Sequence, residues 1–155
     1  MGLFWVSILA VSGLYGFTLY LTRRVENRYP PDGELVDVGG YQMHALHVER
    51  PENADLPAIV FIHGASGNLR DQAGAFLEAL EDRAELLFVD RPGHGWSGRG
   101  GPENARPDGQ ARAIATLMER KGIKEAIVVG HSFGGVIAAG MALERPDRVR
   151  GLLLL

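Results

Sequence analysis

The chain has 155 residues, a formal net charge of −3 and 46% hydrophobic residues, enough for one domain with a substantial apolar core. The mild, evenly spread charge argues against a nucleic-acid-binding surface, and the absence of cysteine excludes disulfides, thiolate zinc sites and cysteine nucleophiles. The histidines are scattered and the acidic residues lack ligand spacing, so we expect no metal site and no cofactor.

The chain begins with a long apolar stretch. Its first 22 residues carry no charged side chain, and residues 2–21 are about as long as a helix that crosses a bilayer core of roughly 30 Å. Trp5 and Tyr20 lie near the two ends, where aromatic side chains anchor a span at the membrane interface. Arginines follow within residues 23–28, and positive charge after the span favours a cytoplasmic position for the rest of the chain.

Two other interpretations of this stretch remain open. A signal peptide cleaved near Ala10-Val11-Ser12 would make the protein secreted or periplasmic, but the positively charged start of a signal peptide is missing. A buried core helix of this length is less usual. We therefore expect residues 1–22 to form a membrane anchor, residues 23–33 a linker and residues 34–155 the folded domain.

Short apolar runs, separated by turn residues, predict the strands of this domain. Residues 34–49 contain two short runs on either side of Gly39-Gly40, which is a hairpin signal. Continuous apolar runs are typical of strands buried on both faces of a sheet. Such runs occupy residues 58–62, 86–89, 126–129 and 151–155.

Helical patterns alternate with these runs. Asn68 and Asp71 resemble a capping box at the start of one helix, and Pro107 is expected to open a second. Residues 133–145 are apolar all round, as expected of a helix covered by other elements, and Pro146 ends it. Alternating strands and helices predict a mostly parallel α/β sheet behind a leading β-hairpin. The apolar faces of the first two helices consist of Ala73, Phe76, Leu77 and Leu80, and of Ala111, Ile114, Ala115 and Met118.

The turn between residues 126–129 and the next helix carries a serine, Ser132. Gly130 and Gly134 flank it two positions away on either side and give the pattern GHSFG. A nucleophilic serine at a strand-to-helix turn has a strained backbone that brings these flanking positions close to other atoms, and glycine avoids the clash. The helix N–H groups would also stabilise negative charge there. The alternative is a glycine-rich turn with a capping serine, but the position between a buried strand and a helix favours a nucleophile.

A second stretch, HGASGN at residues 63–68, directly follows another predicted strand. A tetrahedral intermediate needs two N–H donors aimed at its oxyanion. One donor is expected from Phe133, the residue after the serine, and the other from Ala65. His63 and Gly64 would support this loop, and Gly64 would let its backbone approach closely. The alternative is an ordinary loop that its last residue caps onto the next helix.

Three stretches resemble the α/β-hydrolase fold family in its serine hydrolase branch: FIHGASGN, DRPGHGWSG and VVGHSFGG, in this order and spacing. The resemblance covers about Glu34 to Leu155, and it implies Ser132 as nucleophile with Ala65 and Phe133 as oxyanion donors. Dehalogenases and epoxide hydrolases of this fold carry an aspartate at the elbow. A serine therefore implies carboxylic esters, thioesters, lactones or activated C–C bonds as substrates, cleaved through an acyl-enzyme.

The resemblance also implies roles for the residues around this centre. Asp90 and His94, within DRPGHGWSG, would be structural rather than catalytic. His131, inside the elbow, would be a packing residue. Apart from the resemblance, we expect Trp96 and Phe133 to line the substrate site.

The acid and the base that a catalytic serine needs are missing from this chain. In this fold they follow the serine, first the acid and then the histidine, and an isolated serine hydroxyl is a weak nucleophile. After Ser132 the acidic residues are Glu144 and Asp147, at the end of the helix that follows the serine. The histidines all precede Ser132: His44, His47, His63, His94 and His131. We therefore expect these 155 residues to be the N-terminal part of a longer hydrolase, truncated at about the sixth strand and inactive alone.

The function expected from the sequence is thus that of a serine hydrolase acting on a small-molecule, ester-like substrate. It would be held at a lipid bilayer through residues 2–21 and have no nucleic-acid partner. The alternative is a non-catalytic, membrane-anchored binding protein with a hydrolase-like fold. A nucleotide-binding module is excluded, because GHSFGG lacks both the phosphate-loop lysine and the spacing of a dinucleotide fingerprint.

Overall fold

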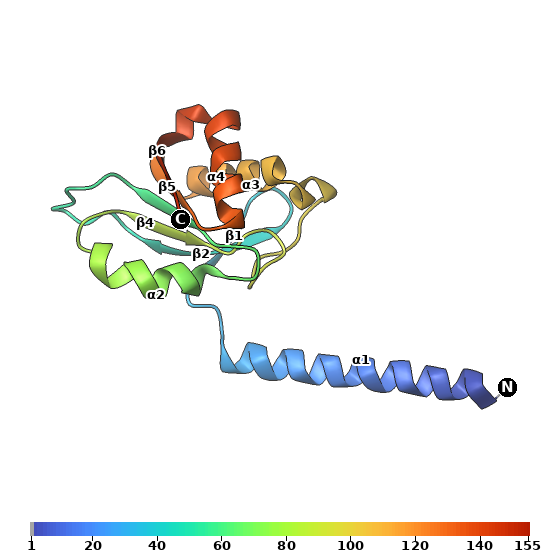
Figure 1. Ribbon diagram of the computed structural model, residues 1–155. Coiled ribbons are helices and arrows are strands. Elements are labelled where there is room, and N and C mark those ends of the chain that lie inside the picture. The colour runs from blue at the N-terminus through green and yellow to red at the C-terminus, as the bar shows by residue number, and fades with distance from the viewer. Residues whose placement is uncertain (1) are drawn as a thin grey trace. The chain divides into compact units, whose positions relative to one another are not determined.

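The structure, a computed structural model, describes residues 2–155. It divides into two compact units, of which one ends at Asp32 and the other spans Gly33–Leu155 (Figure 1). The sheet and the helices packed on it belong to the second unit. The functional residues expected from the sequence also belong to this unit.

The first unit is built around one long helix, α1 (Gly2–Arg28). Its part Phe4–Arg28 is long and apolar enough to cross a membrane, a property that signal sequences share. The helix continues beyond residue 22, where the sequence places the end of the anchor, because most of the polar residues that follow are compatible with a helix. It stops before Tyr29-Pro30, since the residue preceding a proline disfavours helical backbone.

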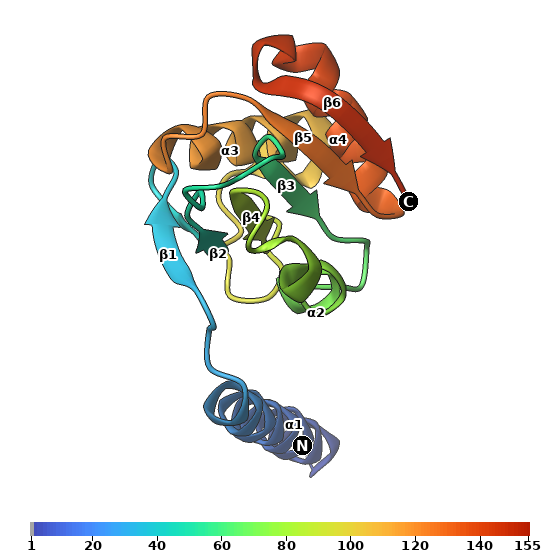
Figure 2. The ribbon, with the colours of Figure 1, turned by 90° about the vertical axis from the view of Figure 1, so that its left-hand side faces the viewer.

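The second unit is organised around one mixed sheet. Its strands are β1 (Glu34–Asp37), β2 (Gln42–Val48), β3 (Ile59–Ile62), β4 (Leu86–Val89), β5 (Ala126–Gly130) and β6 (Val149–Leu154). They lie in the order β1-β2-β4-β3-β5-β6 (Figure 2). β1 and β2 form an antiparallel hairpin and β2 is antiparallel to β4, whereas β4, β3, β5 and β6 run parallel. The predicted α/β sheet with a leading hairpin is therefore confirmed.

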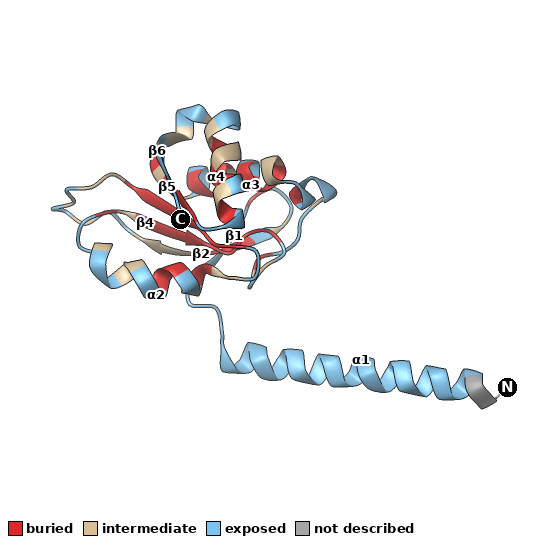
Figure 3. Cartoon of the chain, in the orientation of Figure 1, coloured by how far each residue is buried: buried red, intermediate tan, exposed pale blue. Residues whose placement is uncertain are grey.

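Helices cover both faces of this sheet (Figure 1). They are α2 (Leu69–Leu80), α3 (Pro107–Arg120) and α4 (Phe133–Glu144), with short 3-10 helices at Pro102–Ala105 and Pro146–Arg148. Successive residues of β3 point to opposite faces, so that Phe61 packs with α2 while Val60 and Ile62 pack with α3 and α4. Because both faces are covered, β3 and β4 are buried throughout, as their continuous apolar sequence predicts (Figure 3).

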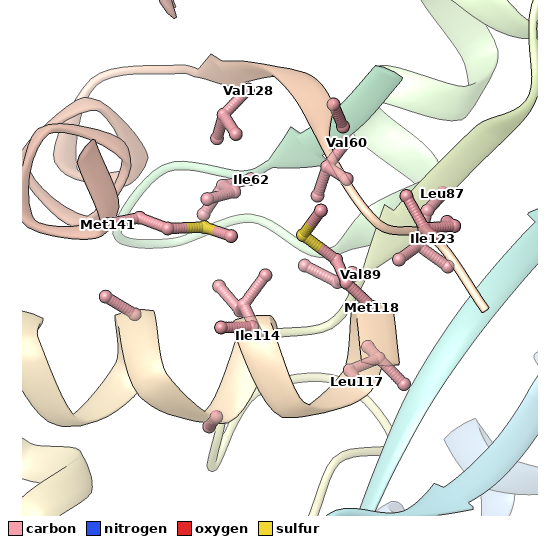
Figure 4. Packing of buried hydrophobic residues seen from close by; sticks show 14 of the residues in the cluster. Val60, Ile62, Leu87, Val89, Ile114, Leu117, Met118, Ile123, Val128 and Met141 are labelled. Carbon is pink, nitrogen blue, oxygen red and sulfur yellow. The ribbon is translucent and has the colours of Figure 1, made fainter. Parts of the chain in front are cut away.

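The larger core lies between the sheet and helices α3 and α4 (Figure 4). Ile62 of β3 and Val89 of β4 meet Ile114 and Met118 of α3 and Met141 of α4 in this layer. Every residue of the apolar faces predicted for α2 and α3 belongs to a core cluster or packs against one. Both helix faces are therefore confirmed.

The predicted helix ends are also confirmed. The Asn68 side chain accepts a hydrogen bond from Arg70 N–H, and the Asp71 carboxylate accepts one from Asn68 N–H, so the capping box is formed. Pro107 is the first residue of α3. Helix α4 ends two residues before Pro146.

Two expectations about burial are wrong. Helix α4, expected to be covered all round, buries Ile137 and Ala138 but leaves Val136 51% and Leu143 84% exposed. Strand β6, expected to be buried, lies at the sheet edge, and residues 152–155 are 41–56% exposed. The reason is topological: within the described residues β5 is the one strand beside β6, and no element packs on the outer side of α4.

Candidate active site

Ser132 lies at the carboxyl end of β5, immediately before the first turn of α4. Its backbone has φ 50° and ψ −118°, and it is the only non-glycine residue with positive φ among residues 2–155. Such a conformation costs about 1–3 kcal/mol and persists where the surrounding structure fixes it. The side chain is exposed and makes no capping hydrogen bond to α4, so its hydroxyl is open to a ligand.

The glycines that flank Ser132 sit in places that admit no side chain. A Cβ at Gly130 would lie 2.6 Å from Gly135 Cα, and a Cβ at Gly134 would lie 2.7 Å from His63 O. Both distances are shorter than atomic contacts allow, and in each case the obstacle is backbone. The elbow is thus formed by a close approach of the ends of β5 and β3 to the first turn of α4.

The loop of residues 63–68 lies directly beside this elbow. A Cβ at Gly64 would be 3.1 Å from His131 Nδ1 and 3.4 Å from Ser132 Cβ, so the missing side chain leaves room for both residues. His131 N–H donates to Ile62 O at 3.0 Å, which fastens the elbow to the end of β3. The two stretches that the sequence singles out therefore meet at one site.

His63 is buried at the base of this loop. Its Nδ1 donates to Gly64 O at 2.8 Å, and its Nε2 accepts from Arg91 N–H at 3.0 Å, an arrangement that requires the neutral ring. Burial lowers the pKa of His63 to about 4, outweighing the contact with Gly64 O, which acts to raise it. At neutral pH the ring is therefore uncharged and serves to fix the loop.

The peptide between Gly64 and Ala65 has a defined orientation. Gly64 O accepts hydrogen bonds from His63 Nδ1 and, at 2.9 Å, from Arg91 Nη2. Because the peptide is planar and trans, Ala65 N–H points away from these groups. Among residues 2–155, neither Ala65 N–H nor Phe133 N–H donates a hydrogen bond. Both expected oxyanion donors are thus unpaired, at the loop and at the elbow respectively.

Asp90, the residue after β4, is a buried junction between three segments. Its carboxylate accepts hydrogen bonds from His44 Nδ1 at 2.7 Å, Leu69 N–H at 2.8 Å and Trp96 N–H at 2.9 Å. Burial acts to raise the pKa of Asp90, but these hydrogen bonds together outweigh it and the pKa is lowered. Asp90 therefore joins β2, the start of α2 and the loop after β4.

The sequence gives no indication of the contact between His44 and Asp90. In the sequence His44 belongs to the hairpin and is far from the ends of the parallel strands, yet its ring is buried and its Nε2 accepts from Gly33 N–H at 3.2 Å. The one local signal is an acidic residue directly after a continuous apolar strand, where burial demands hydrogen-bond partners.

His131 is exposed beside Ser132, and the other remaining histidines and acids are engaged elsewhere. His47 pairs with Glu85 at 2.9 Å, and His94 Nδ1 donates to Pro92 O at 3.2 Å. Glu144 and Asp147 form ion pairs near the C-terminal end of α4, about 18 Å along the helix from Ser132. Within residues 2–155, no histidine is hydrogen-bonded to Ser132 Oγ and no three side chains are grouped as a metal site would require.

Two aromatic residues were expected at the site. Phe133 is 38% exposed beside Ser132, and the Arg91 guanidinium lies 5.2 Å from the centre of its ring. Trp96 is half-buried in the loop after β4, where its backbone N–H donates a hydrogen bond to Asp90 Oδ2.

Comparison with known proteins places these features in a wider group. The model of a family described as "alpha/beta hydrolase fold" matches residues 57–155. The chain is 39% identical over 98 residues to the dihydrolipoyllysine-residue acetyltransferase component of the acetoin cleaving system of Cupriavidus necator, covering 62% of this chain and 25% of the relative. It is 34% identical over 112 residues to lipase LipV of Mycobacterium tuberculosis, covering 71% of this chain and 41% of the relative.

Solved structures show the same fold. The crystal structure of Cfl2 from Burkholderia cenocepacia superimposes with a TM-score of 0.70 and 26% identity, covering 79% of this chain and 40% of that protein. The chain spans between a quarter and about two fifths of the length of the first curated relatives it matches.

Proposed function

Since the chain belongs to the alpha/beta hydrolase fold family, we propose that it carries the nucleophile of a serine hydrolase that cleaves ester-like bonds through an acyl-enzyme. The observation that carries this proposal is the backbone of Ser132, with φ 50° at the turn from β5 to α4. The absence of side chains at Gly130 and Gly134 also supports it, because it lets the backbone around Ser132 approach neighbouring backbone without a clash. Relatives named as lipases support hydrolysis as the reaction class.

In this mechanism Ser132 Oγ attacks the carbonyl carbon of the ester while a general base takes its proton. The carbonyl oxygen becomes an oxyanion that accepts hydrogen bonds from the N–H groups of Ala65 and Phe133. The intermediate collapses, the alcohol leaves with the proton from the base, and the acyl group stays on Ser132. Water, deprotonated by the same base, then attacks the acyl carbon, releases the acid and restores the serine.

We place the general base and its acidic partner after the elbow, in the order acid and then histidine that is usual in this fold. Two facts support this placement. Within residues 2–155 no histidine side chain is hydrogen-bonded to Ser132 Oγ, and the chain spans 25–41% of the length of the first curated relatives it matches. Hydrolysis is accordingly proposed for the full-length protein rather than for these 155 residues.

We place this hydrolase at a membrane, with a lipid-type carboxylic ester as its substrate. The apolar length of Phe4–Arg28 supports the anchor, and relatives named as lipases support the substrate class. The arginines within residues 23–28 favour the cytoplasmic side. In this proposal residues 1–22 form the membrane anchor, residues 23–33 form the linker, and residues 34–155 form the first part of the hydrolase domain.

The activity is tested with the full-length protein, in detergent, on short- and long-chain p-nitrophenyl esters. Ser132→Ala is expected to lower kcat by at least about 1,000-fold, because the nucleophile is lost. Ser66→Ala, which removes an exposed serine from the neighbouring loop, is the matched control and should retain kcat within about threefold. Hydrolysis that survives in Ser132→Ala would refute the proposal. A wild-type protein without hydrolysis would favour the non-catalytic, hydrolase-like binding protein.

The anchor is tested separately by alkaline extraction of membranes. The full-length protein should stay in the membrane pellet, and a variant that starts at Gly33 should be released. A mature protein whose mass lacks residues 1–22 would instead identify this stretch as a cleaved signal sequence.

A further inference from the structure

Arg91, the second residue after β4, is a buried cation, only 1% exposed. Its guanidinium donates from Nε to His63 O at 3.1 Å and from Nη2 to Gly64 O at 2.9 Å. Nη2 also lies 3.4 Å from Ala65 O. One side chain therefore contacts the carbonyl oxygens of three consecutive residues in the loop beside Ser132.

The same guanidinium also contacts the elbow. It lies 5.2 Å from the centre of the Phe133 ring, within the range of a cation–π interaction. Its Nη1 donates to Gln110 Oε1 at 2.9 Å, which ties it to α3. Arg91 thus touches both segments that carry the proposed oxyanion donors, and its own position is fixed from a third element.

The partners of Arg91 do not neutralise its charge. Within residues 2–155 they are carbonyl, amide and imidazole groups rather than carboxylates. Burial lowers the pKa of Arg91, but a guanidinium remains protonated in proteins. A buried charge is costly unless it is fully hydrogen-bonded. The loop carbonyls supply these hydrogen bonds, so the orientation of the loop and the burial of the charge depend on each other.

The peptide between Gly64 and Ala65 needs such a restraint. Gly64 has no Cβ and can therefore adopt backbone conformations that are closed to other residues, so this peptide can rotate at little cost. A rotated peptide would present Gly64 O, an acceptor, where the proposed oxyanion requires the Ala65 N–H donor. The two hydrogen bonds to Gly64 O, from Arg91 Nη2 and His63 Nδ1, oppose this rotation.

We propose that Arg91 is a positioning residue for the oxyanion site: its guanidinium fixes the peptide planes of residues 63–65, so that Ala65 N–H is directed to the oxyanion before the substrate binds. This inference rests on the proposed function of Ser132 and extends it to a residue that touches neither the substrate nor the nucleophile. The fork of parallel donors holds the loop better than a lysine ammonium would, because an ammonium at the same place cannot reach several carbonyls in fixed directions.

The test compares Arg91→Met and Arg91→Lys with wild type in the full-length protein, using a p-nitrophenyl ester. Arg91→Met should lower kcat by about 10- to 100-fold and change KM by less than about threefold, because the donor acts in the transition state. Arg91→Lys should recover part of kcat. Arg99→Met, an exposed arginine of the same loop, is the matched control and should behave as wild type. Rates are normalised to the folded fraction, measured by circular dichroism.

Amide hydrogen exchange gives a readout that does not depend on activity. In Arg91→Met and Arg91→Lys the amides of Gly67 and of residue 91, which donate to Gly64 O and to His63 Nε2, should exchange at least about tenfold faster than in wild type, whereas those of β3 and β5 keep their protection. If Arg91→Met does not fold, the exchange of Arg91→Lys is compared with that of wild type instead. Unchanged exchange in this loop, or a folded variant with wild-type kcat, would overturn the role of Arg91.

Failure of the proposed function looks different from failure of this inference. If Ser132→Ala hydrolyses the ester as fast as wild type, the function of Ser132 is wrong and the oxyanion role of Arg91 falls with it. If Ser132→Ala is inactive and Arg91→Met is folded and fully active, only the role of Arg91 is wrong.

Discussion

Charged side chains are buried at one end of the parallel strands and exposed at the other. At the carboxyl end, beside Ser132, the charged residues Asp90 and Arg91 and the neutral His63 are each about 1% exposed and hydrogen-bonded on several sides. At the amino end the charges pair at the surface. Arg83 and Asp55, which precede β4 and β3, lie 2.7 Å apart and are 52% and 58% exposed.

This contrast shows which charges determine the structure. Exposed ion pairs contribute little, because water screens them and their side chains lose freedom on pairing. A buried charge must be hydrogen-bonded, so its partners are held in fixed places. The buried groups at the carboxyl end therefore fix the loop and the elbow around Ser132, whereas the surface pairs at the amino end leave their surroundings nearly unconstrained.

The largest expected effect comes from removing Asp90. Asp90→Ala leaves His44 Nδ1, Leu69 N–H and Trp96 N–H without their acceptor in a buried place. We expect the free energy of unfolding to fall by about 3–5 kcal/mol, as when one partner of a buried charged pair is removed. Urea unfolding in detergent, followed by circular dichroism, measures it, with Asp55→Ala as the surface comparator. A loss below about 1 kcal/mol would show that Asp90 is not the junction described.

The second effect is a dependence of stability on pH. Burial lowers the pKa of His63 to about 4, below the value of about 6.5 for an unfolded chain. Between these values the unfolded chain binds the additional proton, so stability falls as the pH falls from about 6.5 to 4, by up to about 3 kcal/mol. The lowered pKa of Asp90 acts separately, because its contribution is lost only as the pH falls below about 4.

Unfolding measured at a series of pH values, for wild type and for His63→Asn, isolates this contribution. The variant should have a flatter profile between pH about 6.5 and 4, since the neutral ring is absent. Identical slopes in the two proteins would show that another group titrates in this range.

A third comparison concerns two glycines. Gly134→Ala places a Cβ 2.7 Å from His63 O, so the backbone must move, and we expect a loss of about 1–3 kcal/mol. Gly74→Ala, on an open surface of α2 with no atom within 4 Å of the added Cβ, should instead stabilise by up to about 1 kcal/mol. Thermal unfolding of both variants measures the difference. Equal shifts in Tm would mean that the elbow is not tightly packed.

The smallest effect is expected at the amino end. Arg83→Met removes the exposed pair with Asp55, and its Tm should equal that of wild type within error at both low and high salt. A decrease as large as that of Gly134→Ala would remove the distinction between the two ends.

Local features of the fold could be predicted from the sequence. The capping box of Asn68 and Asp71 depends on residues three apart, and the alternation of the β3 side chains between the two core layers follows from the pleat of a strand. The pattern around Ser132 could be found for the same reason, because its glycines lie two residues away on either side.

Contacts between distant segments could not be predicted. The contact of His44 with Asp90 joins residues 46 apart, and that of Arg91 with Gly64 joins residues 27 apart. Neither spacing leaves a periodic signal. The exposure of β6 is likewise set by its place at the sheet edge rather than by its apolar sequence.

The most direct test of the central proposal is to map where a fluorophosphonate attaches to the full-length protein. The reagent forms a covalent bond with an activated serine, so digestion and mass spectrometry identify the modified residue. We predict one adduct, on the peptide that contains Ser132, and its loss in Ser132→Ala but not in Ser66→Ala. An unmodified Ser132 peptide, or an adduct on another serine, would contradict the account of Ser132 as the nucleophile.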